Sequence, residues 1–189
     1  MVLTSLAIGL GANLPSPAGE PLATLLAVRP LLEQRLMELG GQLRWSPLFR
    51  TAPLGGPADQ PDYLNAVVLF RPLSAAALQP SSHQATQLLA DLQELERRFA
   101  RRRLQRWGPR SLDLDLLWWG DLTACSTTLE LPHPRMLERS FVLAPLAVID
   151  AGLRPPGAAA AAETLLGQLL AQEQGPAPQR LAGQPGWPE

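Results

Sequence analysis

The chain has 189 residues, of which 46% are hydrophobic and 17% are charged, and its formal net charge is −1. This length suits one domain with an extension, and the near-zero charge excludes a general electrostatic attraction to nucleic acid. Cys125 is the single cysteine, which excludes an intrachain disulfide and a zinc site built from cysteines. No apolar stretch reaches the ~20 residues that span a bilayer, and the N-terminus lacks a signal-peptide pattern. We therefore expect a cytoplasmic protein that binds neither membranes nor nucleic acid.

The first half of the chain predicts three strands and one helix. Residues 3–10 form an apolar stretch typical of a buried strand, and apolar periodicity predicts a helix over 20–39. Pro30 lies inside this helix and is expected to kink it or to end its first half. Two further strands are predicted over 43–50 and 63–70, with a loop rich in glycine, proline and polar residues between them.

The second half predicts another helix followed by strands. Apolar residues at helical spacing predict a helix over 85–103 that has a strongly basic end. Residues 111–119 predict a fourth strand and 129–131 a short fifth, whereas the apolar stretch 141–149 receives no assignment. The order β-α-β-β-α-β predicts an α+β fold over residues 1–150, a ferredoxin-like sandwich with an antiparallel sheet.

Residues 151–189 form an extension that is rich in alanine, proline, glutamine and glycine. One helix is predicted there, over 159–173. About fifteen residues at the end contain few large apolar side chains, so we expect this tail to be disordered.

Two aspartates alternate with leucines in residues 111–116 (SLDLDL). In a strand this alternation places Asp113 and Asp115 on one face, about 7 Å apart at the backbone. Carboxylates that are so close repel one another unless a cation lies between them, and Mg²⁺ with phosphate oxygens in its shell would fill that role. Because D-x-D also occurs by chance, the alternative is a solvated strand face without a metal.

Arginines gather immediately before this acidic pair. Arg106 and Arg110 belong to the segment RWGPR, and five more arginines lie at positions 97, 98, 101, 102 and 103. Guanidinium groups bind phosphate oxygens bidentately and keep their charge, so arginines facing metal-bound carboxylates could hold a polyphosphate. The alternative for the upstream arginines is a solvated helix end, because they cannot all face one site. His133 could bind phosphate or carry a proton, although a single loop histidine is more often ordinary surface.

Four motifs follow one another along the chain: FRTAPL at 49–54, QPDYLNA at 60–66, RWGPRSLDLD at 106–115 and LPHPRM at 131–136. In sequence and in order they resemble the motifs of the 6-hydroxymethyl-7,8-dihydropterin pyrophosphokinase family of the folate pathway. The resemblance extends from about residue 6 to residue 149, and its third motif is highly specific.

This resemblance implies an α+β, ferredoxin-like enzyme that transfers pyrophosphate from ATP to the pterin and releases AMP. It implies two Mg²⁺ ions held by Asp113 and Asp115, with ATP as co-substrate. The pterin hydroxyl would attack the β-phosphorus of ATP, and catalysis would consist mainly of positioning and charge neutralisation. We expect a monomer whose partners are these small molecules alone.

The resemblance also assigns roles to residues at matching positions. The pterin-binding residues would be Thr51, Pro53, Leu54, Tyr63, Asn65 and Phe141. The nucleotide-binding residues would be Arg106, Trp107, Arg110, Leu116, His133 and Arg139, with Trp107 in a loop that closes over ATP. The catalytic residues would be Arg101, Arg103, Asp113 and Asp115.

The chain departs from the family pattern in the pocket turn at 52–57, in a longer connection over 72–84, and at Ala100 and Ala12. Ala100 replaces the glycine that usually precedes the first arginine of a G-R-x-R motif, so we expect the helix to continue further. Ala12 replaces a common serine. Two other interpretations stay open: a non-catalytic nucleotide- or RNA-binding module, because ferredoxin-like sandwiches with arginine clusters often bind RNA, and a relative that binds ligand without turnover. Dependence of polyanion binding on Mg²⁺ tests the RNA alternative, because aspartates repel phosphate unless a metal is bound.

Overall fold

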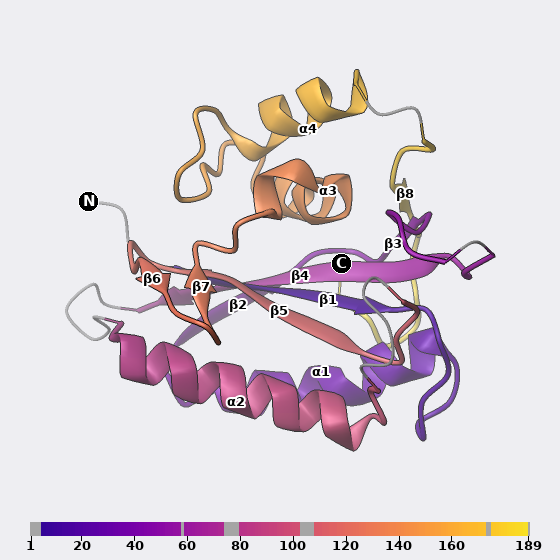
Figure 1. Cartoon of the computed structure of the whole chain (residues 1–189), viewed down its shortest axis with the longest axis horizontal. Coiled ribbons are helices and arrows are strands. Elements are labelled where there is room, and N and C mark those ends of the chain that lie inside the picture. Colours follow the sequence, from indigo (N-terminus) through magenta and orange to yellow (C-terminus); the bar gives the residue numbers. More distant parts are fainter. Residues whose placement is uncertain (1–4, 58, 74–79, 103–107, 173–174, 189) are drawn as a thin grey trace.

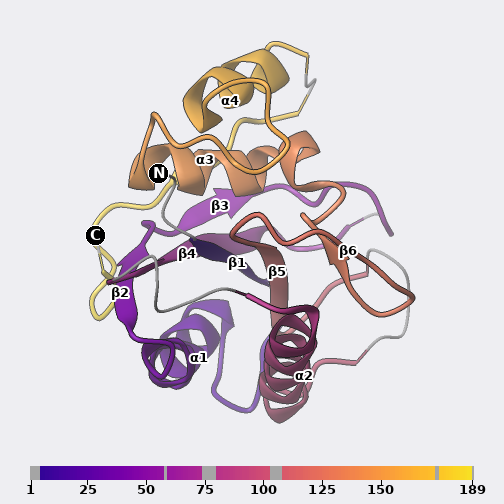
Figure 2. The ribbon, with the colours of Figure 1, turned by 90° about the vertical axis from the view of Figure 1, so that its left-hand side faces the viewer.

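The computed structural model describes residues 5–57, 59–73, 80–102, 108–172 and 175–188. A six-stranded sheet lies between two layers of helices (Figure 1, Figure 2). Helices α1 (Pro21–Met37) and α2 (Ser82–Arg98) cover one face, whereas α3 (Ser140–Ile149) covers the other and carries α4 (Ala162–Leu170) on its outer side. No helix in the described ranges is long and apolar enough to cross a bilayer.

The sheet is built around two neighbouring strands. β1 (Leu6–Ala12) pairs with β4 (Tyr63–Pro72) on one side and with β5 (Asp113–Trp119) on the other, both antiparallel. β2 (Gly41–Trp45) and β3 (Phe49–Thr51) share the opposite edge of β4. This arrangement confirms the predicted α+β, ferredoxin-like fold with an antiparallel sheet.

The remaining elements are short. β8 (Gln179–Arg180) pairs with β3, and β6 (Ala124–Cys125) forms a separate hairpin with β7 (Glu130–Leu131), close to the predicted fifth strand. A 3₁₀ turn spans Met136–Glu138 and leads into α3, which contains the apolar stretch that the sequence left without assignment. α4 is shorter than the helix predicted over 159–173.

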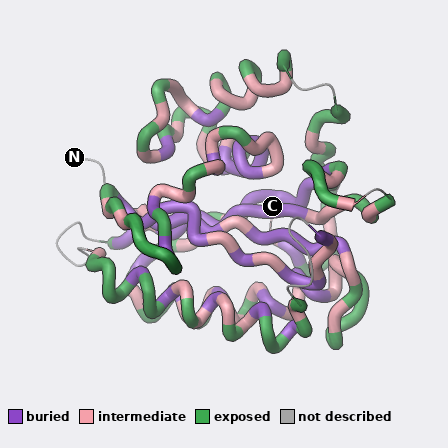
Figure 3. The backbone as a smooth tube through the Cα atoms, viewed as in Figure 1, coloured by how far each residue is buried: buried purple, intermediate pink, exposed green. Residues whose placement is uncertain are grey.

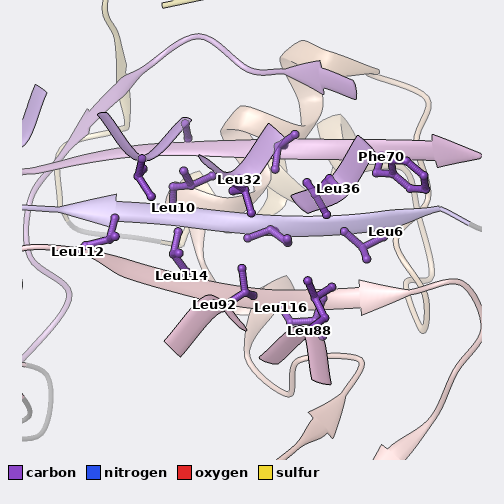
Figure 4. Packing of buried hydrophobic residues seen from close by; sticks show 14 of the residues in the cluster. Leu6, Leu10, Leu32, Leu36, Phe70, Leu88, Leu92, Leu112, Leu114 and Leu116 are labelled. Carbon is purple, nitrogen blue, oxygen red and sulfur yellow. The ribbon is translucent and has the colours of Figure 1, made fainter. Parts of the chain in front are cut away.

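Alternate residues of β1 face the two helical layers. Leu6, Ile8 and Leu10 belong to the main core, which also contains Leu32 of α1 and Leu92 of α2 (Figure 4). Positions 7, 9 and 11 on the opposite face are alanine, glycine and glycine. Figure 3 shows that the sheet strands are largely buried between the helices. β1 is therefore closely packed against α1 and α2 but presents almost no side chains towards α3.

α1 is one continuous helix, so the expectation that Pro30 ends its first half is wrong. Pro30 lies on the exposed side of the helix, where water can bond the carbonyl that the proline ring leaves without a partner. Leu25, Val28 and Leu32 are fully buried. Burial of this apolar stripe stabilises the helix more than the proline weakens it.

α2 ends at Arg98, five residues earlier than predicted. Ala100 has a φ of 60°, the left-handed conformation, and the N–H of Arg101 then donates to the carbonyl of Glu96 at 3.0 Å. This hydrogen bond closes the helix end in the manner usually provided by glycine. The expectation that alanine at position 100 lets the helix continue is therefore wrong.

The single strand predicted over 43–50 is divided into β2 and β3. Ser46 is buried between them, where its N–H donates to the carbonyl of Val67 at 2.9 Å and its Oγ accepts from the N–H of Val67 at 3.0 Å. Pro47 has no N–H to continue the ladder. The chain therefore leaves β4 at Pro47 and returns to it at Phe49.

The tail differs from the disorder expected of it. β8 extends the sheet, and Trp187 is only 6% exposed. Its Nε1 donates to the carbonyl of Ser46 at 2.8 Å, and its ring lies edge-on to Trp45 with 5.4 Å between centroids. The composition of the tail, averaged over its length, does not reveal the effect of this one large side chain.

The division of the chain into domains near residue 150 stays a prediction.

Candidate active site

Asp113 and Asp115 lie on the face of β5 that points towards α3, while the leucines that alternate with them enter the main core. Their partners in β1 are Gly11 and Gly9, which have no side chains to cover them. The carboxylate side chains therefore keep exposures of 16% and 34%. The predicted alternation of acidic and apolar faces is confirmed.

Three arginines neutralise the two carboxylates. Arg101 and Arg110 both pair with Asp113, the former at 2.6 Å from its Oδ1, and Arg139 lies 3.3 Å from Asp115. Burial raises the pKa of Asp115 to about 6, and the negative charge of Asp113 adds to this shift while the arginines oppose it. The two carboxylates thus repel one another and are stabilised by the surrounding guanidinium groups.

A divalent cation suits the chemistry of this pair. Oδ1 of Asp113 is buried and accepts no hydrogen bond from the described residues, although the guanidinium of Arg101 is near it. Carboxylate oxygens are the ligands that Mg²⁺ prefers, and Mg²⁺ usually takes one or two of them together with water and phosphate oxygens. Within the described ranges no cluster of three or more His, Cys, Asp or Glu side chains could hold a metal.

Glu96 of α2 supports the pair from the core side and was not among the predicted site residues. Its side chain is buried, accepts a hydrogen bond from the N–H of Leu114 at 2.8 Å, and pairs with Arg101. The bonded N–H lies between the two aspartates in the chain. Glu96 therefore ties α2, Arg101 and the start of β5 together. The sequence signal for this residue is a carboxylate at an apolar position of the α2 stripe.

A first cavity lies between α3 and the sheet, beside the aspartates. It is lined by all six residues predicted to bind the pterin: Thr51, Pro53, Leu54, Tyr63, Asn65 and Phe141. Gly9 and Gly11 of β1 also line it, as do Arg135 and Val142. Sequence reasoning missed these four residues, although glycines at alternate positions of a buried strand indicate a face that is kept open.

Polar groups in the first cavity are held by hydrogen bonds. Asn65 is 5% exposed, and its Nδ2 donates to Oγ1 of Thr51 at 2.6 Å. Its Oδ1 faces β1, since a Cβ at Gly11 would lie 2.9 Å from that oxygen. The hydroxyl of Tyr63 donates to the carbonyl of Gly108 at 3.1 Å, and burial raises the pKa of Tyr63, so this hydroxyl keeps its proton.

Asn13 joins the loops on either side of the site and was also missed. It is 2% exposed, its Oδ1 accepts from the N–H of Arg110 at 2.7 Å, and its own N–H donates to the carbonyl of Arg110 at 2.9 Å. Its Nδ2 donates to the carbonyl of Pro61 at 3.0 Å. These bonds fix the backbone of Arg110 relative to the loop that precedes Tyr63. An asparagine directly after a buried strand is the available sequence signal.

A second cavity extends from the aspartates towards α2 and the β6–β7 hairpin. Four predicted nucleotide-side residues line it: Arg110, Leu116, His133 and Arg139. Burial, with the positive charge of Arg139, lowers the pKa of His133. The N–H of Arg135 donates to Nδ1 of His133 at 3.2 Å, which leaves Nε2 as the protonated nitrogen of the neutral ring.

The two cavities meet at Arg110, Asp115 and Arg139, each of which lines both. Arg101 lines the second cavity, but three other predicted residues, Arg103, Arg106 and Trp107, lie outside the described residues. The first cavity contains aromatic side chains and both carboxylates, the second is lined by arginines, and Asp115 belongs to both. This arrangement suits the class of Mg²⁺-dependent enzymes that transfer phosphate groups from a nucleotide.

Comparison with known proteins places the chain in one family within this class of phosphate-transferring enzymes. Residues 7–151 match the family described as 7,8-dihydro-6-hydroxymethylpterin-pyrophosphokinase. The chain is 38% identical to the 2-amino-4-hydroxy-6-hydroxymethyldihydropteridine pyrophosphokinase of Haemophilus influenzae over 79% of this chain and 83% of that protein. It is 39% identical to the Synechocystis protein of the same name, over 75% of this chain and 64% of the relative. The chain belongs to the pterin pyrophosphokinase family.

Solved structures agree with the fold. The wild-type HPPK-DHPS protein of Plasmodium falciparum with pteroate matches 89% of this chain and 43% of its own length, with a TM-score of 0.58 and 12% sequence identity. The chain therefore spans less than half of that protein, and the likeness concerns the fold alone.

Proposed function

We propose that the chain transfers the pyrophosphoryl group of MgATP to the hydroxymethyl group of 6-hydroxymethyl-7,8-dihydropterin, which gives AMP and the pterin diphosphate, a step of folate biosynthesis. The observation that carries this proposal is the junction of the two cavities at Asp115 and its neighbours Arg110 and Arg139. A pterin in one cavity and the phosphates of a nucleotide in the other would bring the reacting oxygen and phosphorus together at the carboxylates.

The first cavity suits a flat heterocycle with polar edges. Tyr63 and Phe141 would lie against its ring faces. Asn65, whose amide is oriented by Thr51, would bond the polar edge of the pterin. Pro53 and Leu54 would complete the wall of the pocket. Membership of the family supports each of these roles.

The second cavity suits the phosphates of ATP. Arg101, Arg110 and Arg139 each pair with an aspartate in the structure. When a cation neutralises these aspartates, the guanidinium groups would become available to phosphate oxygens. Leu116 and His133 would contact the nucleotide. The family resemblance alone supports Arg103 as a catalytic residue, Arg106 as a nucleotide ligand and Trp107 in a closing loop.

Asp113 and Asp115 would hold the metal, and we propose two Mg²⁺ ions. Bound Mg²⁺ would supply charge neutralisation at the phosphate oxygens. The chain itself would orient the substrates and exclude water. In the reaction, a bond forms between the hydroxymethyl oxygen and the β-phosphorus, and the bond from that phosphorus to the α,β-bridging oxygen breaks. AMP leaves with the bridging oxygen, and the hydroxyl proton passes to solvent.

AMP formation by the purified protein with ATP, Mg²⁺ and the pterin tests this proposal. We expect pterin-dependent AMP, and a loss of kcat of at least about 100-fold in Asp113→Asn and in Asp115→Asn, because both ligands serve the same charge-stabilising role. Asp121→Asn, an exposed aspartate just after β5, is the matched control and should keep full activity.

Two results would contradict the proposal. Pterin binding without AMP formation would indicate a relative that binds ligand without turnover. RNA binding that is independent of Mg²⁺ would favour the RNA-binding alternative.

We further propose a cytoplasmic monomer that binds neither nucleic acid nor membranes. Light scattering should give a mass of 20.4 kDa for this monomer.

A further inference from the structure

The wall of the first cavity depends on a very short strand. β3 has three residues, pairs with the edge of β4, and ends at Thr51, which accepts the hydrogen bond from Asn65. Residues 52–55, which follow it, line the same cavity. A short strand at a sheet edge opens easily unless other contacts hold it. The geometry of this wall therefore depends on what covers the outer edge of β3.

The C-terminal segment covers that edge. Phe49 and Arg50 of β3 lie opposite Arg180 and Gln179 of β8, and the N–H of Leu181 donates to the carbonyl of Leu48 at 2.8 Å. We name residues 179–187 the C-terminal strap.

Trp187 anchors the far end of the C-terminal strap. Its ring belongs to the main core, contacts Trp45 edge-on, and donates from Nε1 to the carbonyl of Ser46. A Cβ at Gly186 would lie 3.4 Å from Leu26, so the strap also reaches α1. The strap thus holds the chain at both ends of residues 45–50, which lead directly into the cavity wall.

We propose that the C-terminal strap positions β3 and residues 51–55 for pterin binding, with Trp187 as the positioning residue. This inference rests on the proposed function for the identity of the ligand. The strap lies outside residues 7–151, which match the family, so it is a feature of this chain beyond the matched region. No residue of the strap lines either cavity. Because the strap pairs directly with β3, beside the first cavity, we expect its effect to be confined to the pterin side.

Three variants of the full chain test the role of the strap. Trp187→Ala removes the anchor, and Trp187→Phe retains a ring but loses the hydrogen bond to Ser46. Leu36→Ala is the control for a general loss of stability, because Leu36 is fully buried in the main core, at the end of the sheet away from Leu114 (Figure 4). For each variant, two dissociation constants are measured well below the unfolding temperature. One is that of a non-hydrolysable MgATP analogue alone, and the other is that of the pterin with the analogue bound.

We expect Trp187→Ala to raise the Kd of the pterin by about tenfold or more, because the wall is no longer pre-organised, and to change the Kd of the analogue by less than about twofold. Trp187→Phe should give an intermediate rise for the pterin. Leu36→Ala should change neither constant by more than about twofold. An unchanged pterin Kd in folded Trp187→Ala, or an equal rise in Leu36→Ala, would overturn the proposal.

Amide hydrogen exchange separates the strap from the ligand. Exchange over residues 48–55 should become faster in Trp187→Ala and should stay unchanged in Leu36→Ala. If the wild-type protein binds no pterin, the proposed function fails, and the exchange measurement alone then decides whether the strap holds β3. Unchanged exchange in both variants would overturn that role.

Discussion

The negative charge of Asp113 is balanced by the guanidinium groups of two arginines. Arg101 and Arg110 pair with this carboxylate, and buried Glu96 holds Arg101 from the core side. These charges offset one another, which allows two aspartates to lie beside each other in a partly buried site. Binding of Mg²⁺ with a nucleotide would exchange the partners of the carboxylates without placing uncompensated charge in the site.

The raised pKa of Asp115 predicts an unusual pH dependence of stability. The pKa of Asp115 in the folded protein, about 6, exceeds the unfolded value of 3.8. The contribution of this group to the free energy of unfolding is therefore full below pH 4, and it is lost as the pH rises through 6. Asp115→Asn removes this effect. The side chain of Asp115 is 34% exposed, so solvent screening reduces the effect. We expect the free energy of unfolding of Asp115→Asn to exceed that of the wild type by about 1 kcal/mol at pH 7.5.

Thermal unfolding in EDTA at pH 7.5 and at pH 4.5 measures this difference. The Tm advantage of Asp115→Asn should shrink at the lower pH. The exposed control Asp121→Asn should differ from wild type by the same small amount at both values. An advantage of Asp115→Asn that grows on acidification would show that Asp115 is stabilised as the carboxylate.

The backbone of Ala100 predicts a stabilising substitution. Its left-handed conformation is unfavourable for a residue with a Cβ, so Ala100→Gly should stabilise the protein by about 1 kcal/mol. The matched control is Ala90→Gly in the exposed interior of α2, which should destabilise by about 1 kcal/mol. Urea unfolding measures both. Destabilisation by both substitutions would mean that position 100 is not strained.

At the scale of elements, one face of β1 packs in the core and the other forms the floor of the first cavity. The leucine and isoleucine side chains fill the core below the sheet, whereas Gly9 and Gly11 leave room for the first cavity and the carboxylates above it. The pairing of Gly11 with Asp113 and of Gly9 with Asp115 places this open face directly beside the acidic pair. A strand with ordinary side chains at these positions would fill the site.

Alanine at the two glycines should have unequal effects. In Gly11→Ala the new Cβ would lie 2.9 Å from Oδ1 of Asn65, whereas in Gly9→Ala its nearest contact would be 3.7 Å. Gly11→Ala must therefore displace the amide of Asn65, and we expect the Kd of the pterin to rise by about tenfold or more. Gly9→Ala should raise it by about threefold or less. Calorimetric titration measures both, and a larger effect from Gly9→Ala would contradict the role assigned to Asn65.

At the scale of the whole molecule, the site is assembled from segments that span nearly the entire sequence. β1, β4 and β5 supply its floor, and the first turn of α3 supplies Phe141 and Val142. α2 supplies Glu96, and β8 of the tail pairs with β3. The two cavities adjoin and share the charged residues Arg110, Asp115 and Arg139.

This shared lining predicts coupled binding. Because Arg110, Asp115 and Arg139 face both cavities, the MgATP analogue should lower the Kd of the pterin, and the pterin should lower that of the analogue by the same factor, about 5- to 100-fold. Calorimetry in both orders of addition measures the factor. Arg139→Ala should reduce it, while Arg29→Ala on α1, which lines neither cavity, should not. Independent binding in the wild type would contradict the shared junction.

Sequence reasoning reached those parts of the site that local pattern encodes. Alternation in residues 111–116 placed two aspartates on one face, and the family resemblance pointed to six residues that line a single cavity. It failed where a side chain acts on a distant segment. Asn13 bonds Arg110 at a separation of 97 positions, and Trp187 bonds Ser46 at a separation of 141. No periodicity within a short window contains such pairs.

By itself, the sequence of this protein determined the order of its main elements, the acidic face of β5 and the family of its motifs, because side-chain direction in a strand or helix follows from local geometry. Only the tertiary structure decided the open floor at Gly9 and Gly11, the support from Glu96 and the ordering of the tail by Trp187. Each of these depends on which segments become neighbours after folding, when burial of apolar surface and satisfaction of polar groups are settled over the whole chain at once.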